Sequence, residues 1–181
     1  MKPKALILQG WYQKPDANWY PWLTKELQTK GYEVFMPDLP TMHTDMPDMD
    51  KQIAFIENLL PIDEQTIIFG HSIGSLLGLR LAEKHSFRTL FLVAGWDYND
   101  LTKGHKLFWP NKLNHEKIKR HVSDIYCISS DNDPYITAFA TEEMSKRLGG
   151  TCMLIKGAGH FTADFGITKI PEIVPHIENH K

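Results

Sequence analysis

The chain has 181 residues and a mass of 20.9 kDa, enough for one domain with a substantial hydrophobic core. Its net charge of −2 leaves no basic excess with which to bind nucleic acid. No apolar run approaches the roughly 18 residues of a membrane-spanning helix, and Ala5–Gln9 is too short for a secretory signal peptide. We therefore expect a single cytoplasmic domain, residues 1–181, with neither a nucleic-acid nor a membrane partner.

Six short apolar segments predict β-strands. They are Lys4–Gln9, Glu33–Met36, Thr66–Phe69, Thr89–Val93, Asp124–Ile128 and Cys152–Ile155. Two stretches within them, Ala5–Leu8 and Leu90–Val93, are apolar at every position. A strand with one face in water would alternate between apolar and polar residues, so these runs indicate strands buried on both faces, as in a parallel sheet.

Amphipathic segments between the strands predict helices. They are Trp19–Lys30, Asp48–Leu60, Ile73–Lys84, Thr137–Leu148 and a closing helix over Ile170–Asn179. Strands that alternate with helices at this spacing are typical of a doubly wound α/β fold. The segment Gly95–Lys119 has no clear period, and we interpret it as a long loop of the kind that often carries function.

The two cysteines, Cys127 and Cys152, both fall in predicted strands. We expect two buried free thiols in a reducing compartment, with a structural disulfide as the open alternative. Neither they nor the nine histidines form a pair with zinc-ligand spacing beside a third ligand. We expect no metal site and no cofactor.

A candidate nucleophile lies between the third strand and the following helix. Thr66–Phe69 runs into Gly70-His71-Ser72-Ile73-Gly74, the pattern G-x-S-x-G in a strand–turn–helix setting. The two glycines avoid clashes that a Cβ would make at so sharp a turn. The alternative is a glycine-rich turn that binds phosphate, but no dinucleotide or P-loop motif accompanies it. We favour Ser72 as a nucleophile.

A base and an orienting acid are expected after later strands, in the order Ser, Asp or Glu, His. His160 follows the last predicted strand, after the small residues Gly157, Ala158 and Gly159, which suits a tight loop at the carboxyl edge of the sheet. Two carboxylates compete for the third role: Asp131, which could simply form an Asx turn, and Asp133, which precedes a proline. The position of Asp133 further into the loop favours it.

Aromatic residues follow the first strand, where Gly10 allows the chain to turn close to Ser72. The backbone N–H of Ile73, joined by that of Trp11 or else Tyr12, is expected to bind the substrate oxygen. We expect Gly10, Tyr12, Trp96 and Phe161 to form the substrate pocket, with Phe108 and Trp109 as further candidates to close it. Trp19 and Trp22 are interpreted as core residues.

These motifs resemble the small serine hydrolases grouped with retinoblastoma-binding protein 9 and the bacterial YdeN-like proteins. The resemblance covers most of the chain. It is carried by Ile7–Gly10, Asn18–Leu23, Thr66–Gly74, Ser130–Pro134 and Gly157–Phe161. It implies a minimal α/β-hydrolase fold without a large cap domain, and a triad of Ser72, Asp133 and His160. The loop after Gly10 departs from the glycine-rich loop of the vertebrate members.

The sequence thus predicts a serine hydrolase that cleaves small carboxylic esters through an acyl-enzyme. Amides and thioesters are alternative substrates of the same triad, so a peptidase or thioesterase stays open. A lyase on the same scaffold also stays open. The alternative from another class is a protein that kept the fold but acts by binding partners, through exposed aromatic residues.

Overall fold

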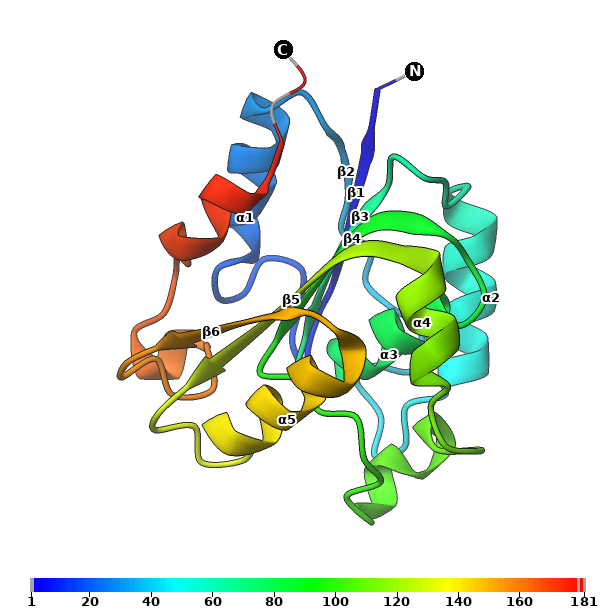
Figure 1. Cartoon of the computed structure of the whole chain (residues 1–181), viewed down its shortest axis with the longest axis vertical. Coiled ribbons are helices and arrows are strands. Elements are labelled where there is room, and N and C mark those ends of the chain that lie inside the picture. The colour runs from blue at the N-terminus through cyan, green and yellow to red at the C-terminus, as the bar shows by residue number, and fades with distance from the viewer. Residues whose placement is uncertain (1, 179, 181) are drawn as a thin grey trace.

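The computed structural model describes residues 2–178 and 180, and in them one parallel sheet runs through the centre of the molecule (Figure 1). Its order is β2-β1-β3-β4-β5-β6. The strands are β1 (Lys4–Leu8), β2 (Glu33–Phe35), β3 (Ile67–His71), β4 (Phe87–Val93), β5 (Val122–Ser130) and β6 (Thr151–Ile155). All six predicted strands are confirmed, within two residues at either end.

Helices cover both faces of the sheet, as Figure 1 shows. They are α1 (Tyr20–Thr29), α2 (Met49–Leu59), α3 (Ile73–Ala82), α4 (His115–His121) and α5 (Ala138–Leu148). Leu6 and Leu8 belong to the buried cluster that includes α2 and α3 residues, whereas Ala5 and Ile7 belong to the cluster that includes α1. Successive side chains of a strand point to opposite faces, so coverage on both sides explains the continuously apolar strands.

The segment Gly95–Lys119 has more regular structure than the long loop that we expected. It contains a 3-10 helix, η1 (Lys103–Phe108), and the first part of α4. Arg80 of α3 is buried beneath it, and its Nε and Nη2 donate to the main-chain oxygen of Phe108 at 3.2 and 3.0 Å. Anchored in this way, the segment is an ordered cover between β4 and β5, formed without a separate cap domain.

The prediction of an α-helix at the end of the chain is wrong as well. Ile170–Asn179 contains only the 3-10 helix η3 (Pro171–His176), and Asn179 lies outside the described residues. Pro175 inside this segment has no backbone N–H to donate, which opposes a regular α-helix. The segment lies beside α1, where Lys30 Nζ donates to the main-chain oxygen of Ile177 at 2.8 Å (Figure 1).

The cysteines lie in neighbouring strands, paired in register as Cys127 of β5 and Cys152 of β6, and both are free thiols. Cys127 is buried as expected, whereas Cys152 is exposed. The expectation of two buried thiols is therefore wrong for Cys152, because β6 is an edge strand of the sheet.

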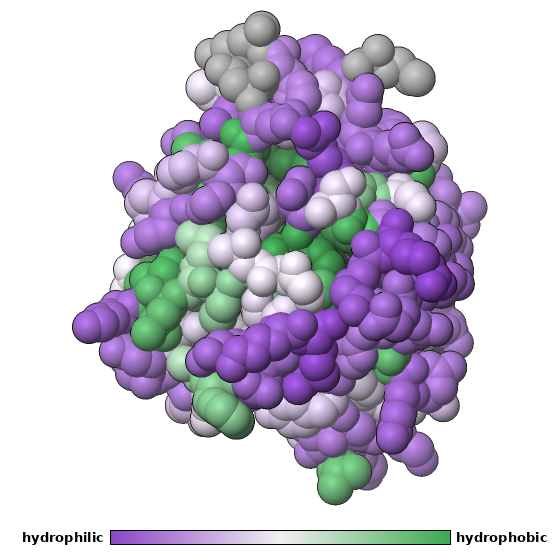
Figure 2. Space-filling model, viewed as in Figure 1, coloured by the Kyte–Doolittle hydropathy of each residue, from purple (hydrophilic) through white to green (hydrophobic). Residues whose placement is uncertain are grey.

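The surface seen in Figure 2 is mostly hydrophilic, with hydrophobic side chains in separate patches. The exposed large apolar side chains include Tyr98, Tyr135, Phe139 and Phe165. None of the helices formed by residues 2–178 and 180 has the length and apolar character needed to cross a bilayer.

Candidate active site

Ser72 occupies a strained turn between β3 and α3. Its φ of 55° and ψ of −122° lie in a region that non-glycine residues rarely adopt. A Cβ on Gly74 would lie 2.3 Å from the main-chain oxygen of Leu8, and a Cβ on Gly70 would lie 2.5 Å from that of Gly74. The two glycines are therefore required by close backbone contacts, as the sequence predicted, and the turn lifts Ser72 to the carboxyl edge of the sheet.

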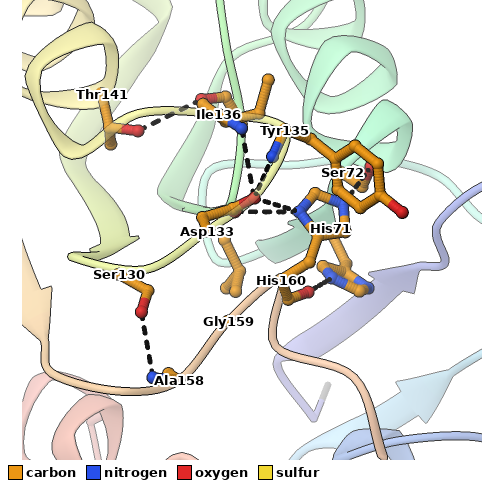
Figure 3. Close-up of polar contacts among 12 residues, drawn as sticks. His71, Ser72, Ser130, Asp133, Tyr135, Ile136, Thr141, Ala158, Gly159 and His160 are labelled. Atoms are coloured by element: carbon orange, nitrogen blue, oxygen red, sulfur yellow. Dashed lines mark hydrogen bonds and ion pairs between the residues drawn. The ribbon is translucent and has the colours of Figure 1, made fainter. Parts of the chain in front are cut away.

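Three side chains meet at this edge, from the loops after β3, β5 and β6 (Figure 3). His160 Nε2 lies 2.9 Å from Ser72 Oγ, and His160 Nδ1 lies 2.8 Å from Asp133 Oδ2. The Asp133 side chain is 1% exposed and that of His160 is 12% exposed. An ionised carboxylate can only accept, so Nδ1 donates to Asp133, which leaves Nε2 free to accept the proton of Ser72.

The two competing aspartates have different partners. Asp133 Oδ1 also accepts the N–H groups of Tyr135 and Ile136, at 2.9 and 3.1 Å, which holds its carboxylate toward His160 (Figure 3). Asp131 Oδ1 instead accepts the N–H of Gly157 at 2.7 Å. Asp133 contacts the imidazole, while Asp131 joins the loop after β5 to the loop after β6.

Further hydrogen bonds hold the same two loops together. Ser130 Oγ accepts the N–H of Ala158 at 2.9 Å, and Asn132 Oδ1 accepts the N–H of Gly159 at 2.7 Å. Gly159 has a φ of +52°, and a Cβ added to it would lie 2.2 Å from the ring of Phe165, which leaves no room for a side chain. These contacts determine where the backbone of His160 lies.

Two backbone donors are expected beside Ser72, on Ile73 at the start of α3 and on Trp11 in the loop after β1. Within the described part of the chain, the N–H groups of Ile73 and Trp11 have no hydrogen-bond acceptor. The N–H of Tyr12, the alternative donor, is engaged with the main-chain oxygen of Met42 at 3.1 Å. Of the two residues considered after Gly10, Trp11 is therefore the one with a free donor.

A cavity of about 700 Å³ opens above Ser72 and His160. Of the four residues expected to form a pocket, Gly10 and Trp96 line this cavity. Further lining side chains escaped the sequence analysis: Tyr98, Asp100, His105, Tyr135, Ile136 and Phe165. They come from the cover after β4 and from loops after β5 and β6, and only the folded chain brings these segments to one place.

Several aromatic residues are placed elsewhere than expected. Phe161 is fully buried in the core, and the Tyr12 hydroxyl donates to Asp45 at 2.7 Å outside the cavity lining. Phe108 is also buried in the core, and Trp109 packs against it. None of these four residues lines the cavity above Ser72, so the wall of the cavity differs from the expectation at these positions.

The core assignment holds for the tryptophans near α1. Trp19 is fully buried in the cluster that includes α1, and Trp22 packs half-buried against that cluster.

Among residues 2–178 and 180, no group of three or more His, Cys, Asp or Glu side chains is arranged to hold a metal ion.

Comparisons with known proteins place this arrangement in a family. The family model described as serine hydrolase matches residues 5–179. Serine hydrolase RBBP9 of Rattus norvegicus is 30% identical over 163 residues, which cover 87% of each chain. The hydrolase YdeN of Bacillus subtilis is 23% identical over 178 residues, or 94% of this chain and 92% of its own.

Solved structures agree on the fold. The crystal structure of the ydeN gene product of B. subtilis matches with a TM-score of 0.84 at 20% identity, over 96% of this chain and 95% of that one. The six-stranded parallel sheet with helices on both faces is thus an α/β-hydrolase fold. Since the family model spans nearly the whole chain, the protein belongs to the serine hydrolase family and is an enzyme of that class.

Proposed function

We propose that this enzyme hydrolyses small carboxylic esters, with Ser72 as nucleophile, His160 as general base and Asp133 as the residue that orients the base. The observation that supports this most directly is the unbroken chain of hydrogen bonds from Asp133 through His160 to Ser72, which lies at the floor of a cavity. A nucleophile, a base within reach of it and a group that orients the base are the components of covalent hydrolysis.

The reaction proceeds in two halves. His160 Nε2 takes the proton of Ser72 as Oγ attacks the ester carbonyl, and the tetrahedral oxyanion lies between the N–H groups of Ile73 and Trp11. The C–O bond to the alcohol then breaks, and the alcohol leaves with the proton from His160. Water attacks the acyl-enzyme by the same route and releases the acid. Asp133 stabilises the imidazolium in both halves.

Small substrates are favoured by the size and composition of the cavity. Its volume of about 700 Å³ is in the range of small-molecule sites. Trp96 is buried in its wall, and Trp11 packs edge-on against His105 with ring centroids 5.2 Å apart. This aromatic lining suits a short acyl chain.

The decisive test is labelling with a fluorophosphonate together with hydrolysis of p-nitrophenyl acetate. Wild-type protein should be labelled at Ser72 and should turn over the ester. Ser72→Ala should lose both, with kcat reduced by about 10⁶-fold. Ser86→Ala, at an exposed serine directly before β4 and so at the opposite edge of the sheet, is the matched control and should keep both. Full activity or labelling of Ser72→Ala would contradict the proposal.

A substrate panel distinguishes the related chemistries. We expect p-nitrophenyl esters with short acyl chains to have a higher kcat/KM than aminoacyl amides or acyl thioesters of equal size. Preference for an amide or a thioester would overturn the ester assignment while leaving the triad in place.

A further inference from the structure

A buried network of hydrogen bonds runs behind the proposed triad, on the side away from Asp133. Tyr20 Oη lies 2.6 Å from His71 Nδ1, and it accepts the N–H of Gly10 at 3.1 Å. On the other side of the ring, His71 Nε2 lies 2.8 Å from the main-chain oxygen of His160 (Figure 3). The network therefore joins four segments: the loop after β1, the start of α1, the end of β3 and the loop after β6.

With His71 neutral, the donors and acceptors of this network allow only one arrangement of protons. The main-chain oxygen of His160 can only accept, so Nε2 of a neutral His71 carries the proton and donates it. Nδ1 then accepts from the Tyr20 hydroxyl, whose oxygen in turn accepts from Gly10. Burial, followed by the nearby His160 imidazole, lowers the pKa of His71 to about 3, and burial raises the pKa of Tyr20 well above its usual value.

Packing keeps both side chains in place. Tyr20 is fully buried and His71 is 1% exposed. The rings of Trp19 and Tyr20 both contact the His71 ring edge-on, with centroids 5.8 Å away in each case. Close packing in a protein interior leaves little free volume in which either ring could turn. The imidazole is therefore a rigid connector rather than a mobile acid or base.

We propose that Tyr20 and His71 are positioning residues, which set the distance between the proposed base and the proposed oxyanion hole. The inference rests on the proposed function, because it assigns His160 as base and Trp11 as donor. One end of the network holds the backbone of His160 itself. The other end holds Gly10, one residue before Trp11, and His71 directly precedes the nucleophile Ser72. A shift of either Tyr20 or His71 would therefore change the distance between the proposed base and the proposed oxyanion hole.

The test uses Tyr20→Phe, which removes only the hydroxyl at the centre of the network. We expect kcat for p-nitrophenyl acetate and the rate of fluorophosphonate labelling to fall together by about tenfold, with KM changed by less than twofold, since misplacement acts on the transition state. The matched control is Tyr32→Phe. Tyr32 is another buried tyrosine, bonded to His180 Nε2 at 3.1 Å away from the cavity, so its variant should keep wild-type kcat.

A second pair of variants tests the histidine. His71→Gln keeps an N–H that can reach the oxygen of His160, whereas His71→Leu does not, so the glutamine variant should retain the higher kcat. The double variant Tyr20→Phe/His71→Gln should be no slower than the slower single variant, because the two residues act as one unit. Circular dichroism is used first to establish that each variant is folded under the conditions in which its rate is measured.

The outcomes separate this inference from the proposed function. Wild-type protein that is not labelled at Ser72 would refute the proposed function itself. Labelled wild type, together with folded Tyr20→Phe that retains full kcat and labelling rate, would refute only the positioning role. Equal losses in Tyr20→Phe and Tyr32→Phe would also refute it, since they would reflect a general loss of packing.

Discussion

Gly104 lies directly against the indole of Trp11, so that a Cβ added to the glycine would lie 2.2 Å from a carbon of the six-membered ring. The indole is also held by its Nε1, which donates to the main-chain oxygen of Thr44 at 2.8 Å. Three segments thus converge on Trp11: its own loop, residues 41–45 and the cover that contains η1.

We predict that Gly104→Ala displaces Trp11 and weakens binding of the oxyanion. Overpacking of this kind costs about 1–3 kcal/mol of stability, and kcat/KM for p-nitrophenyl acetate should fall about tenfold or more through loss of a backbone donor. The same substitution in a Trp11→Phe background should cost less, because the clashing ring is absent. Equal costs in both backgrounds, measured by urea unfolding and kinetics, would contradict the prediction.

The two neighbouring aspartates should differ sharply when they are replaced. Asp133→Asn removes the carboxylate that we propose to select the tautomer of His160, so kcat should fall by about 10⁴-fold. Asp131→Ala removes one hydrogen bond to Gly157, so it should cost up to about 1 kcal/mol of stability and leave kcat within a few-fold of wild type. Steady-state kinetics on both variants checks this, and a greater loss in Asp131→Ala would reverse the assignment.

The stability of the fold should depend on pH through His71. The pKa of His71 falls from 6.5 to about 3 in the folded chain, first through burial and then through the His160 imidazole. The hydrogen bond to the main-chain oxygen of His160, and after it the Asp133 carboxylate, act in the opposite sense. Below pH 6.5 the unfolded chain therefore binds a proton that the folded chain does not. The free energy of unfolding should fall with decreasing pH between 6.5 and about 3, by up to about 1.4 kcal/mol per pH unit.

The matched variant for that measurement is His71→Gln, which has no proton to bind in this range. Urea unfolding at pH 7.5 and pH 4.5 should show a smaller difference for the variant than for wild type. Identical pH differences for the two proteins would show that His71 does not cause the loss.

Two glycines of α3 should respond differently to the same substitution. A Cβ on Gly74 would meet the backbone of β1 at 2.3 Å, and a backbone cannot move aside, so Gly74→Ala should lose at least about 3 kcal/mol or fail to fold. A Cβ on Gly78 would come closest to a methyl group of Leu90, at 3.0 Å, and its next neighbours would be side-chain methyl groups at 3.9 Å. Alanine favours helix by about 1 kcal/mol over glycine, so Gly78→Ala should stay within about 1 kcal/mol of wild type. Thermal melts of the two variants provide the comparison.

The local features of this protein could be read from the sequence alone. Ser72 stands in a strand–turn–helix unit whose requirements, an apolar strand and two small flanking residues, lie within a dozen neighbouring positions. The continuously apolar strands likewise predict coverage on both faces. The closing segment was harder, because its apolar residues have helical spacing while Pro175 opposes the hydrogen bonds of a helix.

Only the tertiary structure decided which side chains face the cavity and how they are held. Phe161 and Trp96 are both aromatic residues that follow strands, and both are buried, but of the two only Trp96 lines the site. The bond from His71 to His160 spans 89 positions of the chain. The direction of a side chain in a loop depends on backbone angles that distant hydrogen bonds impose. The residue type at one position does not reveal which distant groups bond to that part of the backbone.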